Sequence, residues 1–249
     1  MTKLAGKTAV VAGGGKNLGG LVSRHLAGLG ANVAVHYNSP SSEAEARETA
    51  AAVEAAGGKA LLFQGDLTVP ATVTELFDAA VAEFGGVDVA VNTVGKVLRK
   101  PILETSEEEY DSMLDINAKA AYFFIKEAGR TLNDDGTLIT IVTALLGAFT
   151  DGYSTYAGGK SPVEHFNRAA AKEFGTRGIS VNAIAPGPMD TPFFYGQETP
   201  ERVEFHKSQG MGNRLTFIED IAPIVDFLST DGHWITGQTL FANGGYTTR

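Results

Sequence analysis

Tyr156 and Lys160 stand four residues apart in the segment TALLGAFTDGYSTYAGGK, residues 143–160. The run at 161–174 predicts that this segment enters a helix, where residues four apart lie on one face and their side chains meet. A nearby ammonium stabilises a phenolate, so we expect Lys160 to lower the pKa of Tyr156 from its ordinary value of about 10. Such a pair suits proton transfer to or from a carbonyl or alcohol oxygen. The spacing equally fits an inert half-buried tyrosine beside a solvated lysine, and only the rest of the chain can decide.

A glycine-rich turn, GGGKNLGG at residues 13–20, follows an apolar run at 8–12 that predicts a strand. An amphipathic helix comes next and is stopped by Gly30. Strand, glycine turn and helix together aim backbone N–H groups at a phosphate. The turn departs from GxGxxG because Leu18 occupies the last glycine position. It fits a longer turn in which Asn17 replaces a glycine, since asparagine tolerates a left-handed backbone. A merely tight turn fits these residues as well.

Strands and helices alternate along the whole chain. This rhythm predicts a parallel sheet with helices on both faces, in which ligands bind at the carboxyl ends of the strands. Polar residues and glycines gather at such ends, at Asn38, Asp66 and residues 92–95. The expected strands cover residues 8–12, 32–37, 59–64, 87–91, 136–142, 179–185 and 238–241, and further helices are expected at 42–56, 70–84, 106–131, 154–176 and 217–229.

Composition narrows the classes of function. The 249 residues carry a net charge of −9, which argues against a nucleic-acid partner or an anionic membrane surface. There is no cysteine, which excludes disulfides and thiol catalysis, and the five histidines lack metal-ligand spacing, so we expect no metal. The apolar runs are too short to span a bilayer, and the N-terminal stretch does not fit a signal peptide. We therefore expect a cytoplasmic protein.

The alternation breaks at residues 192–214, where Phe193, Phe194, Tyr195 and Phe205 gather. One interpretation is a mobile lid over an apolar ligand, which we place at about 188–214. The other is an ordinary surface subdomain whose aromatic side chains pack on one another.

Taken together, the motifs resemble those of the short-chain dehydrogenase/reductases, closest in pattern to bacterial ketoreductases of the 3-oxoacyl-carrier-protein reductase type. The resemblance runs from about Lys7 to Gly245, and the order of its motifs is more specific than any one of them. These motifs are AGGGKNLG, GDLT, NTVG, DINAKAAYFF, YAGGK, APGPMDT and ITGQTLFANGG. The resemblance implies a single α/β domain over residues 1–249, with a doubly wound (Rossmann) sheet of seven parallel strands, and a nicotinamide dinucleotide as ligand.

The resemblance also implies where the cofactor would lie. The pyrophosphate would be approached by Gly13, Asn17, Leu18 and Gly19. The adenine would be held by Asp66 and Leu67, and the ribose side would be lined by Asn92, Val94 and Gly95. The nicotinamide would lie against Pro186, Gly187, Met189 and Thr191.

Charge at the end of the second strand indicates which dinucleotide is used. NAD enzymes usually place an acid there, which binds the ribose hydroxyls and would repel a 2′-phosphate. Here the strand ends in His36, Tyr37, Asn38 and Ser39, without a carboxylate. Lys16 stands in the glycine turn, where NADP-using relatives commonly carry a base. The sequence therefore predicts NADP(H).

By the same resemblance Tyr156 would be the acid in reduction, Lys160 would bind the nicotinamide ribose, and Asn117 would continue a proton relay through water. Read alone, Asn117 is equally a satisfied core amide. Relatives also carry a serine that hydrogen-bonds the substrate oxygen. Counting thirteen residues back from Tyr156 gives Thr143, whereas alignment on the following glycine leaves the choice between Thr143 and Ala144 open. An alanine in that place would cost about 3 kcal/mol, or about a hundredfold in rate.

These observations favour an NADPH-dependent reductase that interconverts a ketone and a secondary alcohol. The aromatic lid together with Leu145, Leu146 and Tyr153 favours a bulky or aryl small-molecule carbonyl substrate. The alternative is a non-catalytic dinucleotide-binding regulator whose active site is impaired at Ala144. Relatives pair through the helices that correspond to 106–131 and 154–176, which implies a homotetramer.

Overall fold

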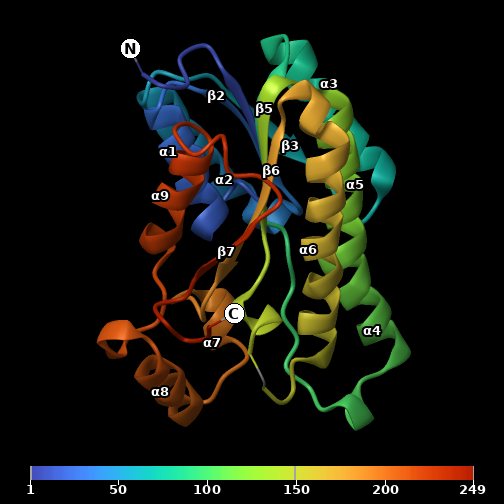
Figure 1. Cartoon of the computed structure of the whole chain (residues 1–249), viewed down its shortest axis with the longest axis vertical. Helices are drawn as coiled ribbons and strands as arrows, with labels where there is room; N and C mark the ends of the chain where they lie inside the picture. Colours follow the sequence, from blue (N-terminus) through green and yellow to red (C-terminus); the bar gives the residue numbers. More distant parts are fainter. Residues whose placement is uncertain (1, 149, 249) are drawn as a thin grey trace.

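A computed structural model describes residues 2–148 and 150–248; residues 1, 149 and 249 of the expected domain lie outside the described residues. The described residues form a seven-stranded parallel sheet in the order β3-β2-β1-β4-β5-β6-β7. The order reverses between β1 and β4, which confirms the predicted doubly wound sheet (Figure 1). The strands are β1 (Thr8–Ala12), β2 (Asn32–Tyr37), β3 (Ala60–Gln64), β4 (Val87–Asn92), β5 (Leu132–Ile141), β6 (Ser180–Pro186) and β7 (Thr239–Ala242).

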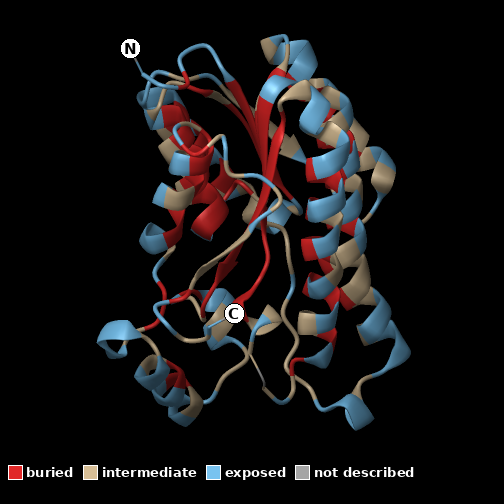
Figure 2. Ribbon diagram, viewed as in Figure 1, coloured by how far each residue is buried: buried red, intermediate tan, exposed pale blue. Residues whose placement is uncertain are grey.

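Helices cover both faces of the sheet (Figure 1). One face carries α1 (Asn17–Gly28), α2 (Glu43–Ala55) and α9 (Ile218–Leu228), and the other carries α3 (Pro70–Phe84), α5 (Ala120–Thr131) and α6 (Ser154–Phe174). Because successive strand residues point to opposite faces, Val10 joins the core under α3, α5 and α6 while Val11 joins the core under α1 and α9. Buried residues accordingly follow the strands and the inner helix faces (Figure 2).

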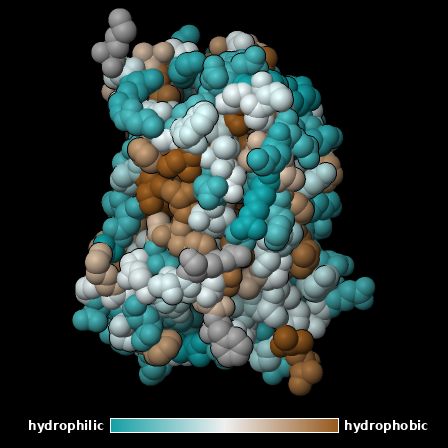
Figure 3. Space-filling view, viewed as in Figure 1, coloured by the Kyte–Doolittle hydropathy of each residue, from teal (hydrophilic) through white to brown (hydrophobic). Residues whose placement is uncertain are grey.

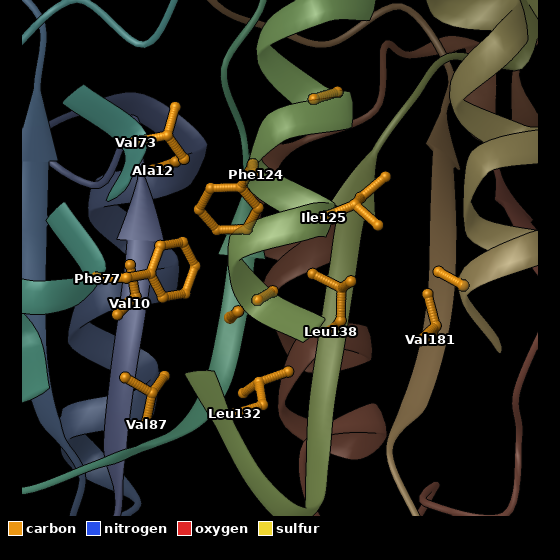
Figure 4. Packing of buried hydrophobic residues seen from close by; sticks show 14 of the residues in the cluster. Val10, Ala12, Val73, Phe77, Val87, Phe124, Ile125, Leu132, Leu138 and Val181 are labelled. Carbon is orange, nitrogen blue, oxygen red and sulfur yellow. The ribbon is translucent and has the colours of Figure 1, made fainter. Parts of the chain in front are cut away.

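The core under α3 and α5 is organised by two aromatic rings. Phe77 and Phe124 are fully buried, with ring centroids 5.1 Å apart, and Val10, Leu132 and Leu138 lie around them (Figure 4). The outer surface is mostly hydrophilic on the face that Figure 3 shows, with apolar side chains confined to small areas.

One expected helix is divided. Residues 106–131 were expected to form a continuous helix, but α4 (Glu107–Leu114) is followed by a π-helical turn at Asp115–Lys119 before α5 begins. The start is as predicted, since Ser106 and Glu109 form a capping box. Inside the turn the Asn117 amide donates to the carbonyl oxygen of Met113 at 3.0 Å, and a side chain that competes for a carbonyl in this way perturbs the helical ladder.

Residues 188–214, the expected lid, contain α7 (Pro192–Tyr195), α8 (Pro200–Gln209) and a short 3-10 turn at Met211–Asn213. They lie below the carboxyl ends of the central strands (Figure 1). The expected strand bounds agree with the structure within one residue, except that β5 begins at Leu132, where residue 136 was expected. No helix among the described residues is long and apolar enough to cross a membrane.

Candidate functional site

Two adjoining cavities open at the carboxyl ends of the strands. The first, which we call the glycine groove, has a volume of about 1290 Å³ and follows the glycine turn and the ends of β2, β3 and β4. The second, which we call the apolar cavity, has a volume of about 660 Å³ and lies between the residues that follow β5 and β6 and the segment 188–214. Both are lined by Val142, Tyr156, Met189, Thr191 and Phe193. Ligands in the two cavities would therefore meet beside Tyr156.

The glycine turn takes the backbone conformation that its sequence suggests. Gly13 has φ +72° and Asn17 has φ +48°, which confirms that Asn17 stands where a left-handed residue is needed. Gly19 is required for space, because a Cβ there would lie 2.1 Å from the carbonyl oxygen of Gly13. The turn thus presents bare backbone to the groove at the N-terminus of α1, where N–H groups favour an anion.

His36 fixes this turn, a role that was not expected from the sequence. Its Nδ1 accepts a hydrogen bond from the Gly13 N–H at 3.0 Å, and its Nε2 lies 2.8 Å from the carbonyl oxygen of Gly65. Burial lowers the pKa of His36, so the ring is neutral and Nε2 carries the proton that it donates to Gly65. The only sign of this role in the sequence is that a polar residue, His36, stands in the otherwise apolar end of the strand NVAVHY.

Lys160 lies in the groove, and its ammonium binds two backbone carbonyl groups. Its ammonium donates to the carbonyl oxygens of Val94 and Ile141, both at 3.0 Å. Burial lowers the pKa of Lys160 to about 8, and burial raises the pKa of Tyr156 to about 12, opposed by a hydrogen bond with the Thr143 hydroxyl. The expectation that Lys160 lowers the Tyr156 pKa is therefore wrong for this structure: removal from water sets the direction for both groups.

The lowered pKa of Lys160 predicts a pH-dependent stability. Between pH 8 and 10.5 the unfolded chain binds a proton on this lysine that the folded chain has lost, so stability rises with pH. A shift of this size corresponds to about 3 kcal/mol. The free energy of unfolding is measured by urea titration for the parent protein and for Lys160→Met. We expect the difference between the two, parent minus variant, to rise by about 3 kcal/mol from pH 8 to pH 10.5. A difference that stays constant with pH would show that Lys160 titrates normally.

Asn117 holds backbone and does not line either cavity. Its Oδ1 accepts from the Lys96 N–H at 3.1 Å, and its Nδ2 donates to the Lys96 carbonyl at 2.8 Å as well as to Met113. A Cβ at Gly95 would lie 3.0 Å from Lys160 Nζ and 3.1 Å from Asn117 Oδ1, so a side chain at this position would crowd both groups. The expected relay through Asn117 to solvent stays a prediction.

Most of the expected cofactor residues line the two cavities, whereas Ser39 and Asn92 line neither. Ser39 bonds to Ser41, and Asn92 accepts from the Val94 N–H at 2.9 Å and so shapes the turn behind the groove. The glycine groove contains Gly13, Lys16, Asn17, Leu18, Gly19, Tyr37, Asn38, Asp66, Leu67, Val94, Gly95, Tyr156, Lys160, Met189 and Thr191; the apolar cavity contains Thr143, Pro186 and Gly187.

Three further polar residues, Ser42, Thr68 and Thr93, line the groove and were not expected. Ser42, Asn38 and Lys16 line the same groove, and the Lys16 ammonium forms an exposed ion pair with the Glu45 carboxylate at 3.5 Å. An exposed pair of this kind contributes little, so Lys16 stays able to bind another anion. Among the described residues no group of His, Asp and Glu side chains is arranged to hold a metal ion.

Comparisons with known proteins cover nearly the whole chain. Residues 13–247 match the family described as "Enoyl-(Acyl carrier protein) reductase". An NADPH-dependent aldehyde reductase-like protein, chloroplastic, from Arabidopsis thaliana is 34% identical over 98% of this chain and 95% of its own. A putative dehydrogenase from Burkholderia cenocepacia, solved with bound NADP, is 58% identical, with a TM-score of 0.97 over 100% of this chain and 96% of that one. The angucycline C-6 ketoreductase LanV, also with bound NADP, is 31% identical with a TM-score of 0.91 over 98% of this chain and 96% of that one.

Proposed function

The chain belongs to the short-chain dehydrogenase/reductase family, and from that premise we propose that it is an NADPH-dependent carbonyl reductase acting reversibly on ketones and secondary alcohols. The observation that carries this proposal is the position of Tyr156, which lines both the glycine groove and the apolar cavity. A proton donor at this junction reaches a carbonyl oxygen in one cavity while the other holds the nucleotide.

The groove fits a dinucleotide phosphate. Gly13, Asn17 and Gly19 form a cradle that a side chain at Gly19 would fill, and Lys16 offers a cation beside Asn38. The absence of an acid at the end of β2 favours a 2′-phosphate. The expectation of NADP(H) also agrees with the nucleotides bound in the two solved relatives.

When bound, NADPH supplies the hydride, and the protein supplies position and a proton. With its pKa raised to about 12, Tyr156 holds its proton at neutral pH and donates it to the carbonyl oxygen. The buried ammonium of Lys160 lies on the groove side and would bind ribose hydroxyls there. The reverse reaction needs the phenolate, so alcohol oxidation should gain rate as pH rises while ketone reduction does not.

Thr143 is the second donor in this proposal. Its hydroxyl opposes the rise of the Tyr156 pKa and lines the apolar cavity with Tyr156, whereas Ala144 offers a methyl group. The alternative of a non-catalytic regulator rests on Ala144, and the presence of the Thr143 hydroxyl in the same cavity as Tyr156 weighs against it.

Replacing Thr143 by valine should lower kcat/KM for ketone reduction by about a hundredfold, the usual effect of losing one preorganised donor. Valine keeps the shape and removes the hydroxyl. Steady-state rates of Thr143→Val and Thr143→Ser measure it, and the serine variant should keep most of the activity. If Ala144→Ser restores Thr143→Val to the parent rate, residue 144 and not residue 143 is the natural donor position.

The substrate we propose is a bulky, largely apolar ketone, with the segment 188–214 as its lid. Val97, Leu145, Pro188, Phe193 and Phe194 line the apolar cavity, and three of these five lie in that segment. Ketone-dependent oxidation of NADPH, followed at the nicotinamide absorbance band with aryl ketones, β-keto esters and 3-oxoacyl thioesters, tests the function. The proposal predicts turnover of aryl ketones and much weaker turnover with NADH.

The cytoplasmic location stays a prediction.

The assembly that we propose is a homotetramer. Tyr122 on α5 is 50% exposed, and its ring packs edge-on against Phe123 and against Phe166 of α6, with centroids 5.5 and 5.1 Å away. Aromatic side chains are enriched at protein interfaces, so an exposed cluster of them on two adjacent helices supports the proposal that a second copy of the chain binds there. Light scattering of the purified protein measures the number of copies.

A further inference from the structure

A buried carboxylate, Glu198, lies behind the apolar cavity, two residues before α8 begins. Its side chain is 0% exposed. Arg202 Nε donates to it at 3.0 Å, and Arg99 Nε lies 3.8 Å away. Asp151 contacts both guanidinium groups, at 3.2 Å from Arg99 and 3.0 Å from Arg202. Two carboxylates and two guanidinium groups balance, so Glu198 is ionised and can only accept hydrogen bonds.

Three side chains link this carboxylate to the cavity. Tyr153, His206 and Tyr246 all line the apolar cavity. The Tyr153 hydroxyl donates to Glu198, His206 Nε2 lies 3.3 Å from the same carboxylate oxygen, and His206 Nδ1 lies 2.8 Å from the Tyr246 hydroxyl.

The direction of each hydrogen bond follows from Glu198 being an acceptor. His206 Nε2 must carry the proton that it shares with Glu198. Burial lowers the pKa of His206 and outweighs the opposing effect of Glu198, so the ring is neutral and its Nδ1 is an acceptor. The Tyr246 hydroxyl therefore donates to Nδ1. Burial raises the pKa of Tyr153 and of Tyr246, so both phenols keep their protons.

Both phenol protons are thus committed to partners behind the cavity wall. Each phenol oxygen can therefore only accept a further hydrogen bond, and the single N–H of neutral His206 already donates to Glu198. Tyr153, His206 and Tyr246 therefore accept hydrogen bonds from the cavity and donate none to it. A carboxylate or phosphate that contacts these three side chains would find no donor among them, and a methyl ether would leave their oxygens unpaired.

We propose that the enzyme selects neutral carbonyl compounds that carry a hydroxyl donor at the end away from the carbonyl, recognised by Tyr246 and Tyr153. Glu198 and His206 are positioning residues that turn these phenols into acceptors. The inference rests on the proposed function for the carbonyl end of the ligand, while recognition of the hydroxyl does not depend on turnover.

The test compares three ligands of one shape: 6-hydroxy-1-tetralone, 6-methoxy-1-tetralone and the 6-carboxylate of 1-tetralone. Calorimetry measures their dissociation constants with the NADPH-saturated Tyr156→Phe protein, in which the ketones are not turned over. The same titrations are run with Tyr246→Phe added, and with Tyr195→Phe added as the matched control. Tyr195 lies in the segment 188–214 and donates to Asp190 at 2.8 Å, outside the apolar cavity.

We expect the hydroxy ligand to bind about tenfold more tightly than the methoxy ligand, the effect of one well-made hydrogen bond, and the carboxylate to bind most weakly. Tyr246→Phe should remove the preference and Tyr195→Phe should keep it. Equal binding of the hydroxy and methoxy ligands, tightest binding of the carboxylate, or no binding of any of the three overturns the inference. A hydroxyl preference without turnover by the parent protein would instead keep the inference and reject the reductase.

Discussion

Replacing Tyr156 by phenylalanine should lower kcat/KM for ketone reduction by about a thousandfold or more, because it removes the phenol that we propose as the general acid at the junction of the two cavities. Phenylalanine keeps the ring, whose centroid lies 6.3 Å from that of Tyr153 and 6.2 Å from that of Phe193. The cavity shape should therefore persist, and NADPH affinity should stay within a few-fold of the parent.

Stopped-flow rates of NADPH oxidation and a fluorescence titration of NADPH measure the two quantities for Tyr156→Phe. Tyr153→Phe is a useful companion, since it removes a neighbouring phenol that donates to Glu198. If Tyr153→Phe loses its rate of reduction while Tyr156→Phe keeps the parent rate, Tyr153 is the general acid and our assignment of Tyr156 is wrong.

Replacing Gly19 by alanine should raise the dissociation constant for NADPH by about a hundredfold. The new Cβ would lie 2.1 Å from the Gly13 carbonyl oxygen and 2.7 Å from Thr93 Oγ1, so the turn must open, and strain of a few kcal/mol corresponds to that factor. The displaced backbone is the part of the groove that we assign to the pyrophosphate.

Gly28→Ala is the matched control for this variant. Gly28 belongs to the same helix, α1, and a Cβ there meets nothing within 4 Å. Its NADPH affinity should equal that of the parent protein. Unchanged affinity in Gly19→Ala, measured below its unfolding temperature, would mean that the nucleotide does not approach this turn.

The sequence predicts the parts of the fold that depend on local pattern. Apolar runs such as TAVVA and SVNAIAP need two buried faces, which only a covered parallel sheet provides. The left-handed conformation of Asn17 was predictable for a similar reason, since few residues other than glycine tolerate it.

What could not be predicted depends on contacts between distant residues. Asn117, inside the π-helical turn, hydrogen-bonds the backbone of Lys96 twenty-one residues earlier as well as the Met113 carbonyl, and no local pattern contains the first of these contacts. The direction of the Tyr156 pKa depends on how far α6 is buried and on where the Lys160 ammonium points, neither of which the four-residue spacing contains. The Glu198 network joins residues 99, 151, 198 and 246, so no single stretch of sequence carries its signal.

The central claim is that this chain transfers a hydride from NADPH to a ketone carbon while Tyr156 protonates the oxygen. Reduction of 1-tetralone with NADPH deuterated at both C4 positions of the nicotinamide, followed by mass spectrometry of the product, tests it most directly. We predict 1-tetralol with one deuterium, bonded to the carbinol carbon, formed by the parent protein and not by Tyr156→Phe. Binding of NADPH with no deuterated alcohol from 1-tetralone or from any other aryl ketone of the panel would contradict the claim.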